Sequence, residues 1–195
     1  MVSLLRAERV ADDGRILVLG AGGGLELRAL AEAHPGWHFD GVDPSAAMLE
    51  LARDTAAPHM DRIALHHGYV DVAPEGAFDG AVSLLTFHFI PREDRLDTLR
   101  QLRRRLRPGA PLVVAHVSFT QTEPERSAWI ARHAAWPAGP DADPAQLEAA
   151  RQAIGTRLSI LAPEEEEAML REAGFTGVSL FYAGLSFRGW VAYAG

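Results

Sequence analysis

Short apolar runs alternate along this chain with longer segments whose leucines recur at helical spacing. Residues 15–19, RILVL, are almost wholly apolar and stop at a glycine cluster, which is typical of a strand buried on both faces of a parallel sheet. Residues 25–34 follow with leucines at helical spacing, and Pro35 with Gly36 ends this helix. The pattern predicts a strand, a tight turn and a helix.

The same alternation continues and predicts an α/β fold. Helices are expected at residues 46–57, 92–106 and 163–173, and further strands at residues 37–42, 62–67, 78–85, 111–118, 177–182 and 186–194. Because helices separate most strands, we expect a three-layer, Rossmann-like sheet of seven mostly parallel strands. The final connection of three residues is too short for a parallel crossover, so the last strand should be antiparallel.

Residues 120–161 break this alternation after the fifth strand. They hold helical segments around WIARHAAW and PAQLEAARQAIGTRL, separated by the turn-rich stretch PAGPDADP. We expect a helical insertion there, within a single domain that covers residues 1–195. Glutamates 164–167 and the arginine-rich residues 103–107 suit the helix ends at which they stand, and we expect the glutamates to be solvated.

The composition fits a soluble globular protein. Of 195 residues, 48% are hydrophobic and 23% are charged, and Cys 0 leaves no disulfide, thiolate metal ligand or cysteine nucleophile. A formal net charge of -7 argues against bulk nucleic-acid binding. No window approaches the roughly 18 apolar residues of a membrane span. We therefore expect a cytoplasmic protein without a membrane segment.

A glycine-rich turn, Gly20 to Gly24, follows the first strand. Glycine lets the backbone approach a ligand at this carboxyl edge, where a side chain would collide. Leu25 stands where a dinucleotide fingerprint has its last glycine, so the pattern is GxGxG and nicotinamide and flavin are disfavoured. Asp43 ends the second strand, where a carboxylate can accept hydrogen bonds from the ribose hydroxyls of an adenosine.

Four segments carry a resemblance to a known family. They read ILVLGAGGGLELRALAEAHP, FDGVDPSAAMLELAR, FDGAVSLLTFHFI and LRRRLRPGAPLVVAHVS. In this order they resemble the Rossmann-like S-adenosylmethionine-dependent methyltransferases, whose sheet has seven strands with an antiparallel seventh. Val18 and Tyr69 depart from the family, which often has acidic residues at both places.

The resemblance implies that the cofactor is S-adenosyl-L-methionine. It assigns the methionine part to the glycine turn, the ribose to the end of the second strand, and the adenine to the segment after the third strand. The implied cofactor-binding residues are Gly20, Ala21, Gly22, Gly24, Asp43, Pro44, Met48, Gly68, Tyr69, Val70 and Leu84.

Candidate residues for catalysis and acceptor binding follow the fourth and fifth strands. His88 could act as a base or a donor, although a histidine among apolar neighbours is as often a packed one. The hydrophobic spacing also allows core packing for the four candidate acceptor residues, Phe87, His116, Trp129 and Trp136. The neighbouring loops hold no carboxylate cluster, so we expect no metal.

The chain lacks both a cysteine nucleophile and an Asn/Asp-Pro-Pro-aromatic motif after the fourth strand, so methylation of nucleic-acid bases is disfavoured. The expected activity is therefore methyl transfer to a small molecule. The insertion is then a lid and acceptor wall. One alternative is a carboxy-S-adenosylmethionine synthase, which needs a cation for the extra carboxylate. The other is a non-catalytic, regulatory cofactor-binding domain, and a homodimer stays open. The candidate cations are Arg126, Arg132, Arg157 and Arg188.

Overall fold

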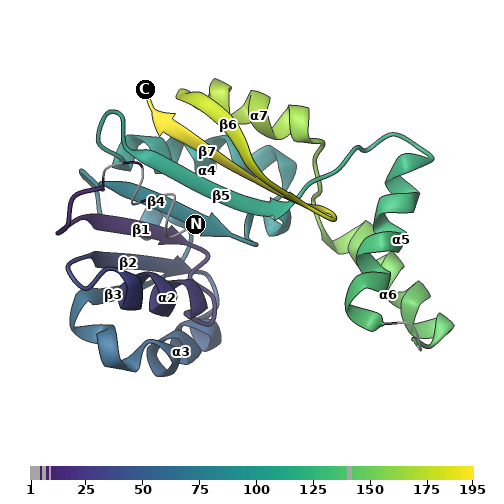
Figure 1. Ribbon diagram of the computed structural model, residues 1–195, viewed down its shortest axis with the longest axis horizontal. Helices are drawn as coiled ribbons and strands as arrows, with labels where there is room; N and C mark the ends of the chain where they lie inside the picture. The colour runs from purple at the N-terminus through teal and green to yellow at the C-terminus, as the bar shows by residue number, and fades with distance from the viewer. Residues whose placement is uncertain (1–4, 6–7, 9, 140–141) are drawn as a thin grey trace.

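The computed structural model describes residues 5, 8, 10–139 and 142–195. Its strands form a seven-stranded sheet in the order β3-β2-β1-β4-β5-β7-β6 (Figure 1). Strand β7 pairs antiparallel with β5 and β6, and the other neighbouring strands are parallel, so the predicted fold class is confirmed. The strands are β1 Arg15–Leu19, β2 His38–Asp43, β3 Ile63–His67, β4 Gly80–Leu84, β5 Pro111–Val117, β6 Phe175–Gly184 and β7 Phe187–Ala194.

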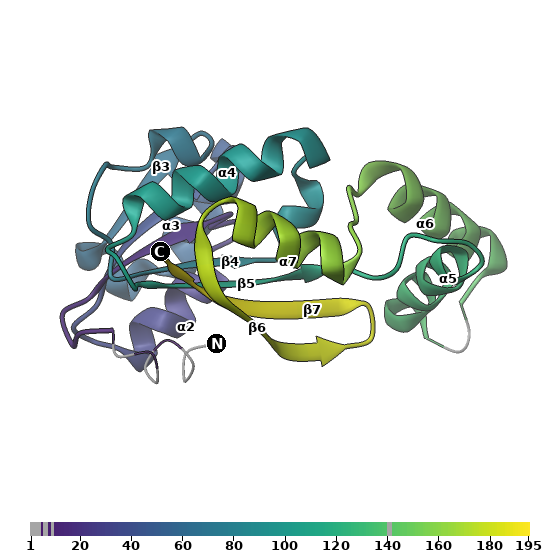
Figure 2. The ribbon, with the colours of Figure 1, turned by 90° about the horizontal axis from the view of Figure 1, so that it is seen from above.

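Helices cover both faces of the sheet, as Figure 2 shows for α4 and α7 on one face and α2 on the other. No helix among the described residues is long and apolar enough to cross a bilayer. The covering helices are α2 Leu25–Ala33, α3 Ala46–Thr55, α4 Arg92–Arg105 and α7 Pro163–Glu172, and three short 3-10 helices are η1 Ala57–Arg62, η2 Val70–Val72 and η3 Phe87–Phe89.

Strand β1 contributes to two separate cores because alternate side chains of a strand point to opposite faces. Leu17 and Leu19 pack in the core beneath α4 and α7, whereas Ile16 and Val18 pack in the core beneath α2 and α3. Burial of both faces explains why the RILVL run is continuous instead of alternating.

Element boundaries differ from the predictions where tertiary contacts decide them. The predicted strand at 78–85 shortens to β4, because Phe78 makes only an isolated bridge with Leu106 and Leu85 turns with a φ of 54°. The predicted strand at 177–182 instead lengthens to β6, whose pairing with β7 runs from Phe175 to Gly184 with two register shifts.

The predicted insertion forms two helices, α5 Glu125–Ala138 and α6 Pro144–Arg157. They pack against each other and project beyond the carboxyl end of β5 (Figure 1). A small core at the base of this helical hairpin contains Val117, Phe119 and Ile130. The chain then returns to α7 through residues 158–162, which we call the return segment.

Candidate functional site

The glycine turn after β1 has one packed side and one open side. Gly20 has a φ of 75°, and a Cβ added there would lie 1.9 Å from Thr86 Oγ1, so the loop after β4 excludes any side chain. Gly22 has a φ of 46°, but its added Cβ would meet nothing closer than Gly20 O at 3.7 Å. The backbone at Gly22 is therefore open to a ligand.

Asp43 joins this turn to the end of β2. Its Oδ2 accepts a hydrogen bond from Gly22 N at 2.9 Å, and its Oδ1 accepts one from Ser45 N at 2.8 Å. Each carboxylate oxygen can accept more than one hydrogen bond, so Asp43 retains acceptor capacity for hydroxyl groups. The side chain is thus held in place before any ligand arrives.

The segment after β3 lies beside Asp43, because Gly68 N donates to Asp43 O at 3.1 Å. Tyr69 is 73% exposed, whereas Val70 is buried in the core beneath α4. Tyr69 can therefore offer a side chain to a ligand, and Val70 can offer only its backbone.

Large apolar side chains remain exposed around this edge of the sheet. They belong to the turns and the helix starts that follow four parallel strands, whose carboxyl ends lie at one edge. A concentration of exposed apolar groups with a few fixed polar groups is typical of a small-molecule site. These side chains are Leu25, Met48, Tyr69, Leu85 and Phe89.

Other predicted cofactor residues lie at the same edge. Pro44 follows β2, and its carbonyl faces His67 Nε2 at 3.0 Å. Ser45 caps α3 by accepting a hydrogen bond from Met48 N at 3.3 Å. Leu84 ends β4 and is half-buried, and Ala21 N donates to Val42 O at 2.9 Å.

His88 lies buried in η3. Its Nδ1 accepts a hydrogen bond from Val117 N at 3.3 Å, which leaves the ring proton on Nε2. Burial, together with the charges of His116, Arg95 and His133, lowers the pKa of His88 to about 3, and Glu166 opposes this shift only weakly. At neutral pH the ring is therefore uncharged, and the geometry favours a donor at Nε2 over a general base.

His116 belongs to the core beneath α4 and α7. Its Nε2 lies 3.0 Å from Glu166 Oε1, and its ring packs between Phe87 and Trp190, each with centroids 5.5 Å away. A cavity of about 10 Å³, close to the size of one water, borders these side chains. Burial of Phe87 and His116 weighs against side-chain contact with an acceptor, although their role stays a prediction.

The two tryptophans of α5 lie apart from that core. Trp129 stacks on Phe119 with centroids 6.2 Å apart, and Trp136 is 68% exposed with its edge toward Phe187. The structure thus separates the four candidate acceptor residues into a core pair and a hairpin pair. Acceptor contact by Trp129 and Trp136 also stays a prediction.

Sequence reasoning missed three charged residues near this edge. Glu26, in the first turn of α2, is half-buried, and its pKa is raised to about 7 by burial and by the charge of Asp43. Glu166 is buried, contrary to the expectation of a solvated glutamate run. Its partner Arg95 precedes Leu99 by four positions, and this helical spacing could have placed it on the buried face.

Similarity to known proteins agrees with this geometry. A family model described as a methyltransferase domain matches residues 16–109. The carboxy-S-adenosyl-L-methionine synthase of Chromohalobacter salexigens is 28% identical over 203 residues, covering 99% of this chain and 73% of that protein. Residues 16–109 therefore form a methyltransferase domain.

Solved structures show that this methyltransferase shares its fold with larger proteins. Human N-acetylserotonin methyltransferase, solved with S-adenosylmethionine, has a TM-score of 0.67 at 18% identity over 99% of this chain. An O-methyltransferase family protein of Burkholderia thailandensis has a TM-score of 0.70 at 15% identity over 100% of this chain. The methyltransferase chain spans only 51% and 55% of their respective lengths.

The residues of this methyltransferase fit S-adenosyl-L-methionine. Gly22 has no Cβ to fill the open side of the turn, and this space can take the methionine part. The oxygens of Asp43 retain capacity for the ribose hydroxyls, and exposed Tyr69 can lie against the adenine. No metal-binding group of three or more acidic or histidine side chains occurs in the described ranges.

Proposed function

We propose that this methyltransferase transfers the methyl group of S-adenosyl-L-methionine to a small-molecule acceptor. The observation that carries the proposal is the glycine turn, which the hydrogen bond from Gly22 N to Asp43 Oδ2 at 2.9 Å holds in place. A Cβ added at Gly22 would meet nothing closer than Gly20 O at 3.7 Å, so the turn is open on that side. This arrangement provides a fixed backbone surface and a fixed carboxylate at the carboxyl edge of the sheet.

The chain's own residues chiefly bind the cofactor, orient the acceptor and exclude water. When bound, the cofactor supplies a methyl group that is already activated on a sulfonium, so alignment of the acceptor matters most. The apolar side chains Leu85 and Phe89, after β4, would exclude water from the acceptor. His88 would donate a hydrogen bond from Nε2 to an acceptor oxygen or nitrogen.

A small acceptor is favoured over a large polyanion. The net charge of -7 opposes extensive contact with a phosphate backbone. The helical hairpin extends beyond the carboxyl edge, where it would form an acceptor wall or lid (Figure 2). The absence of cysteine fits a reducing, cytoplasmic location, and a homodimer remains part of the proposal.

Calorimetric titration with S-adenosylmethionine and its demethylated product tests cofactor binding. Asp43→Ala should weaken both by about 1.5 to 3 kcal/mol, the scale of a hydrogen bond to a charged group, or roughly ten- to 150-fold in Kd. The matched control is Asp54→Ala, because Asp54 is exposed on α3. An unchanged affinity in Asp43→Ala, or preferential binding of a nicotinamide dinucleotide, would contradict the assignment.

A second candidate function is synthesis of carboxy-S-adenosylmethionine. A relative that carries this name matches 99% of the chain. Arg132 and Arg188 approach the Trp129 ring with centroid distances of 4.8 and 5.8 Å, and Arg188 also donates to the carbonyls of Leu185 and Phe187. Either guanidinium could receive an additional carboxylate.

Mass spectrometry of the cofactor after incubation with candidate acceptors and carboxylate donors separates the functions. Methyl transfer yields the demethylated cofactor, whereas the synthase reaction yields a cofactor with an added carboxyl group. Tight cofactor binding with neither product would instead favour the non-catalytic, regulatory alternative.

A further inference from the structure

Arg95 is completely buried, although it lies in the first turn of α4 and carries a charge. Its side chain is 0% exposed, and its ion-pair partner, Glu166 of α7, is 5% exposed. Burial alone would raise the pKa of Glu166, but the contacts with His116 and Arg95 outweigh burial and lower it. The pair is therefore ionised at neutral pH and removed from water.

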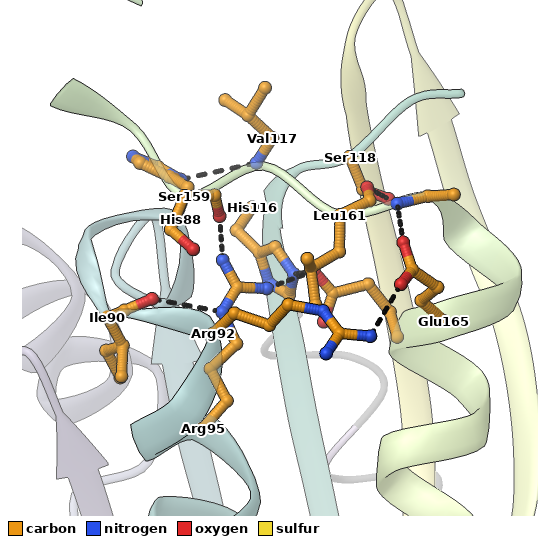
Figure 3. A network of polar contacts seen from close by, with 12 residues as sticks. His88, Ile90, Arg92, Arg95, His116, Val117, Ser118, Ser159, Leu161 and Glu165 are labelled. Atoms are coloured by element: carbon orange, nitrogen blue, oxygen red, sulfur yellow. Dashed lines mark hydrogen bonds and ion pairs between the residues drawn. The ribbon is translucent and has the colours of Figure 1, made fainter. Parts of the chain in front are cut away.

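The guanidinium of Arg95 joins three segments that are distant in sequence. Its Nε donates to Ile90 O at 3.1 Å, which fixes the end of η3. Its Nη1 pairs with Glu166, and its Nη2 donates to Ser159 O in the return segment. Figure 3 shows the guanidinium between the Ile90 and Ser159 carbonyls. A planar group with five donors suits this task, which an ammonium could fulfil only in part.

Additional hydrogen bonds hold the return segment against the same region. Ser159 N donates to His88 O at 2.9 Å, and Ser118 Oγ donates to Leu161 O at 2.9 Å. His88 in turn accepts from Val117 N, at the end of β5 (Figure 3). The segment that carries His88 and the segment that leaves the helical hairpin are thus directly connected.

Stability alone is a poor explanation for this arrangement. Removing two charges from water is costly, and well-packed apolar residues in place of a buried ion pair are often neutral or stabilising. The charged pair instead adds specificity, because its donors and acceptors are all satisfied in one relative placement of η3, α7 and the return segment.

We propose that Arg95 is a positioning residue that locks the His88 segment, residues 87–90, to the return segment of the helical hairpin. The two predicted walls of the acceptor site then keep one relative placement. The link to an acceptor rests on the proposed function, whereas the lock is a property of the fold and can be tested without substrate.

The lock also predicts an electrostatic effect on His88. Four charged or titratable groups influence this ring: His116 on β5, His133 on α5, Arg95 on α4 and Glu166 on α7. Loss of the Arg95 charge should raise the pKa of His88, and loss of the Glu166 charge should lower it. A general loss of packing would not move the pKa in opposite directions.

Amide hydrogen exchange at Ser159 tests the lock, because this amide donates to His88 O. Arg95→Met should accelerate exchange at Ser159 by about tenfold or more through local opening, and Arg95→Lys should restore part of the protection. Exchange at Val82, in the buried strand β4, should change much less.

The matched control is Arg92→Met. Arg92 pairs with Glu165 at 2.8 Å and joins the same two helices, but the side chains are 60% and 39% exposed. Surface pairs of this kind contribute little, so exchange at Ser159 should stay close to that of the wild type. NMR titration of the His88 ring in Arg95→Met and Glu166→Gln provides the second measurement.

The proposal is overturned if Ser159 exchanges no faster in Arg95→Met than in Arg92→Met, or if Ser159 and Val82 accelerate together. It is also overturned if the His88 pKa shifts in the same direction in both charge variants. If Arg95→Met does not fold, Arg95→Lys supplies the exchange comparison, in which Ser159 should exchange faster than in Arg92→Met. Glu166→Gln then supplies the electrostatic comparison, in which the pKa of His88 should fall. Failure of the wild type to bind S-adenosylmethionine would refute the proposed function but leave these measurements decisive for the lock.

Discussion

Acidification should destabilise the folded protein through His88, because the folded state holds this ring in its neutral form. The pKa is lowered from its ordinary value of 6.5 to about 3 by burial and by neighbouring positive charges. Between these two values the unfolded chain binds a proton at His88 and the folded chain does not. The free energy of unfolding must therefore decrease as the pH falls through this interval.

The size of the effect follows from the two pKa values. At about pH 7.5 both states are nearly uncharged at His88, so its contribution is close to zero. At about pH 5 the unfolded ring is protonated and the folded ring is not, which lowers the free energy of unfolding by about 2 kcal/mol. His88 is only 5% exposed, so solvent screening does not remove this effect.

Urea unfolding at both pH values measures the contribution. His88→Asn retains an oxygen that can accept from Val117 N but does not titrate, so its free energy of unfolding should fall by about 2 kcal/mol less than that of the wild type. His38→Asn is the control, since His38 is exposed at the start of β2. Comparing changes within each protein cancels the titration of Glu166, His133 and the other groups they share.

An equal pH dependence in the wild type and His88→Asn would refute the reasoning. It would mean that the folded ring accepts a proton readily, so His88 would regain the role of a general base. The low pKa and the Val117 hydrogen bond would then describe the folded state incorrectly.

Two further substitutions test the glycine turn and its neighbour. Gly22→Val should abolish most cofactor binding by filling the open side of the turn. Gly109→Val, also at a positive φ and in open space, should strain the backbone without affecting binding. Equal losses of affinity in the two variants would contradict this prediction. The pKa of Glu26 is raised to about 7, so at about pH 8 its ionised carboxylate is less favourable in the folded state than in the unfolded chain and lowers the free energy of unfolding. Glu26→Gln removes this charge and should stabilise the protein at that pH. In urea unfolding Glu32→Gln, exposed on the same helix, should lack this gain, and destabilisation by Glu26→Gln would count against the burial argument.

The fold was largely predictable because its signals are local. Continuous apolar runs such as residues 15–19 identify strands buried on both faces, and the short final connection identifies an antiparallel pair. The placement of Gly22 and Asp43 at one edge of the sheet was predictable for a similar reason, since Gly22 follows the first strand and Asp43 ends the second. The structure brings these two residues into direct contact.

The surroundings of the candidate acceptor residues were less predictable because they depend on long-range packing. Sequence spacing could not separate His116, buried against Glu166, from Trp136, exposed on the hairpin. The glutamate run suits a solvated helix terminus, yet Glu166 meets Arg95 from a helix about 70 positions earlier. Such a pairing requires the tertiary arrangement of α4 and α7.

The position of the site follows from the order of the strands. The chain moves outward from β1 to β2 and β3, then returns to place β4 on the opposite side of β1. Loops from these neighbouring strands therefore diverge toward different faces and leave a crevice, which is where open α/β sheets bind ligands. Thr86 and Gly20 meet at this divide. The location of the proposed cofactor site thus follows from topology, so sequence change in the distant hairpin should alter the proposed acceptor wall without relocating that site.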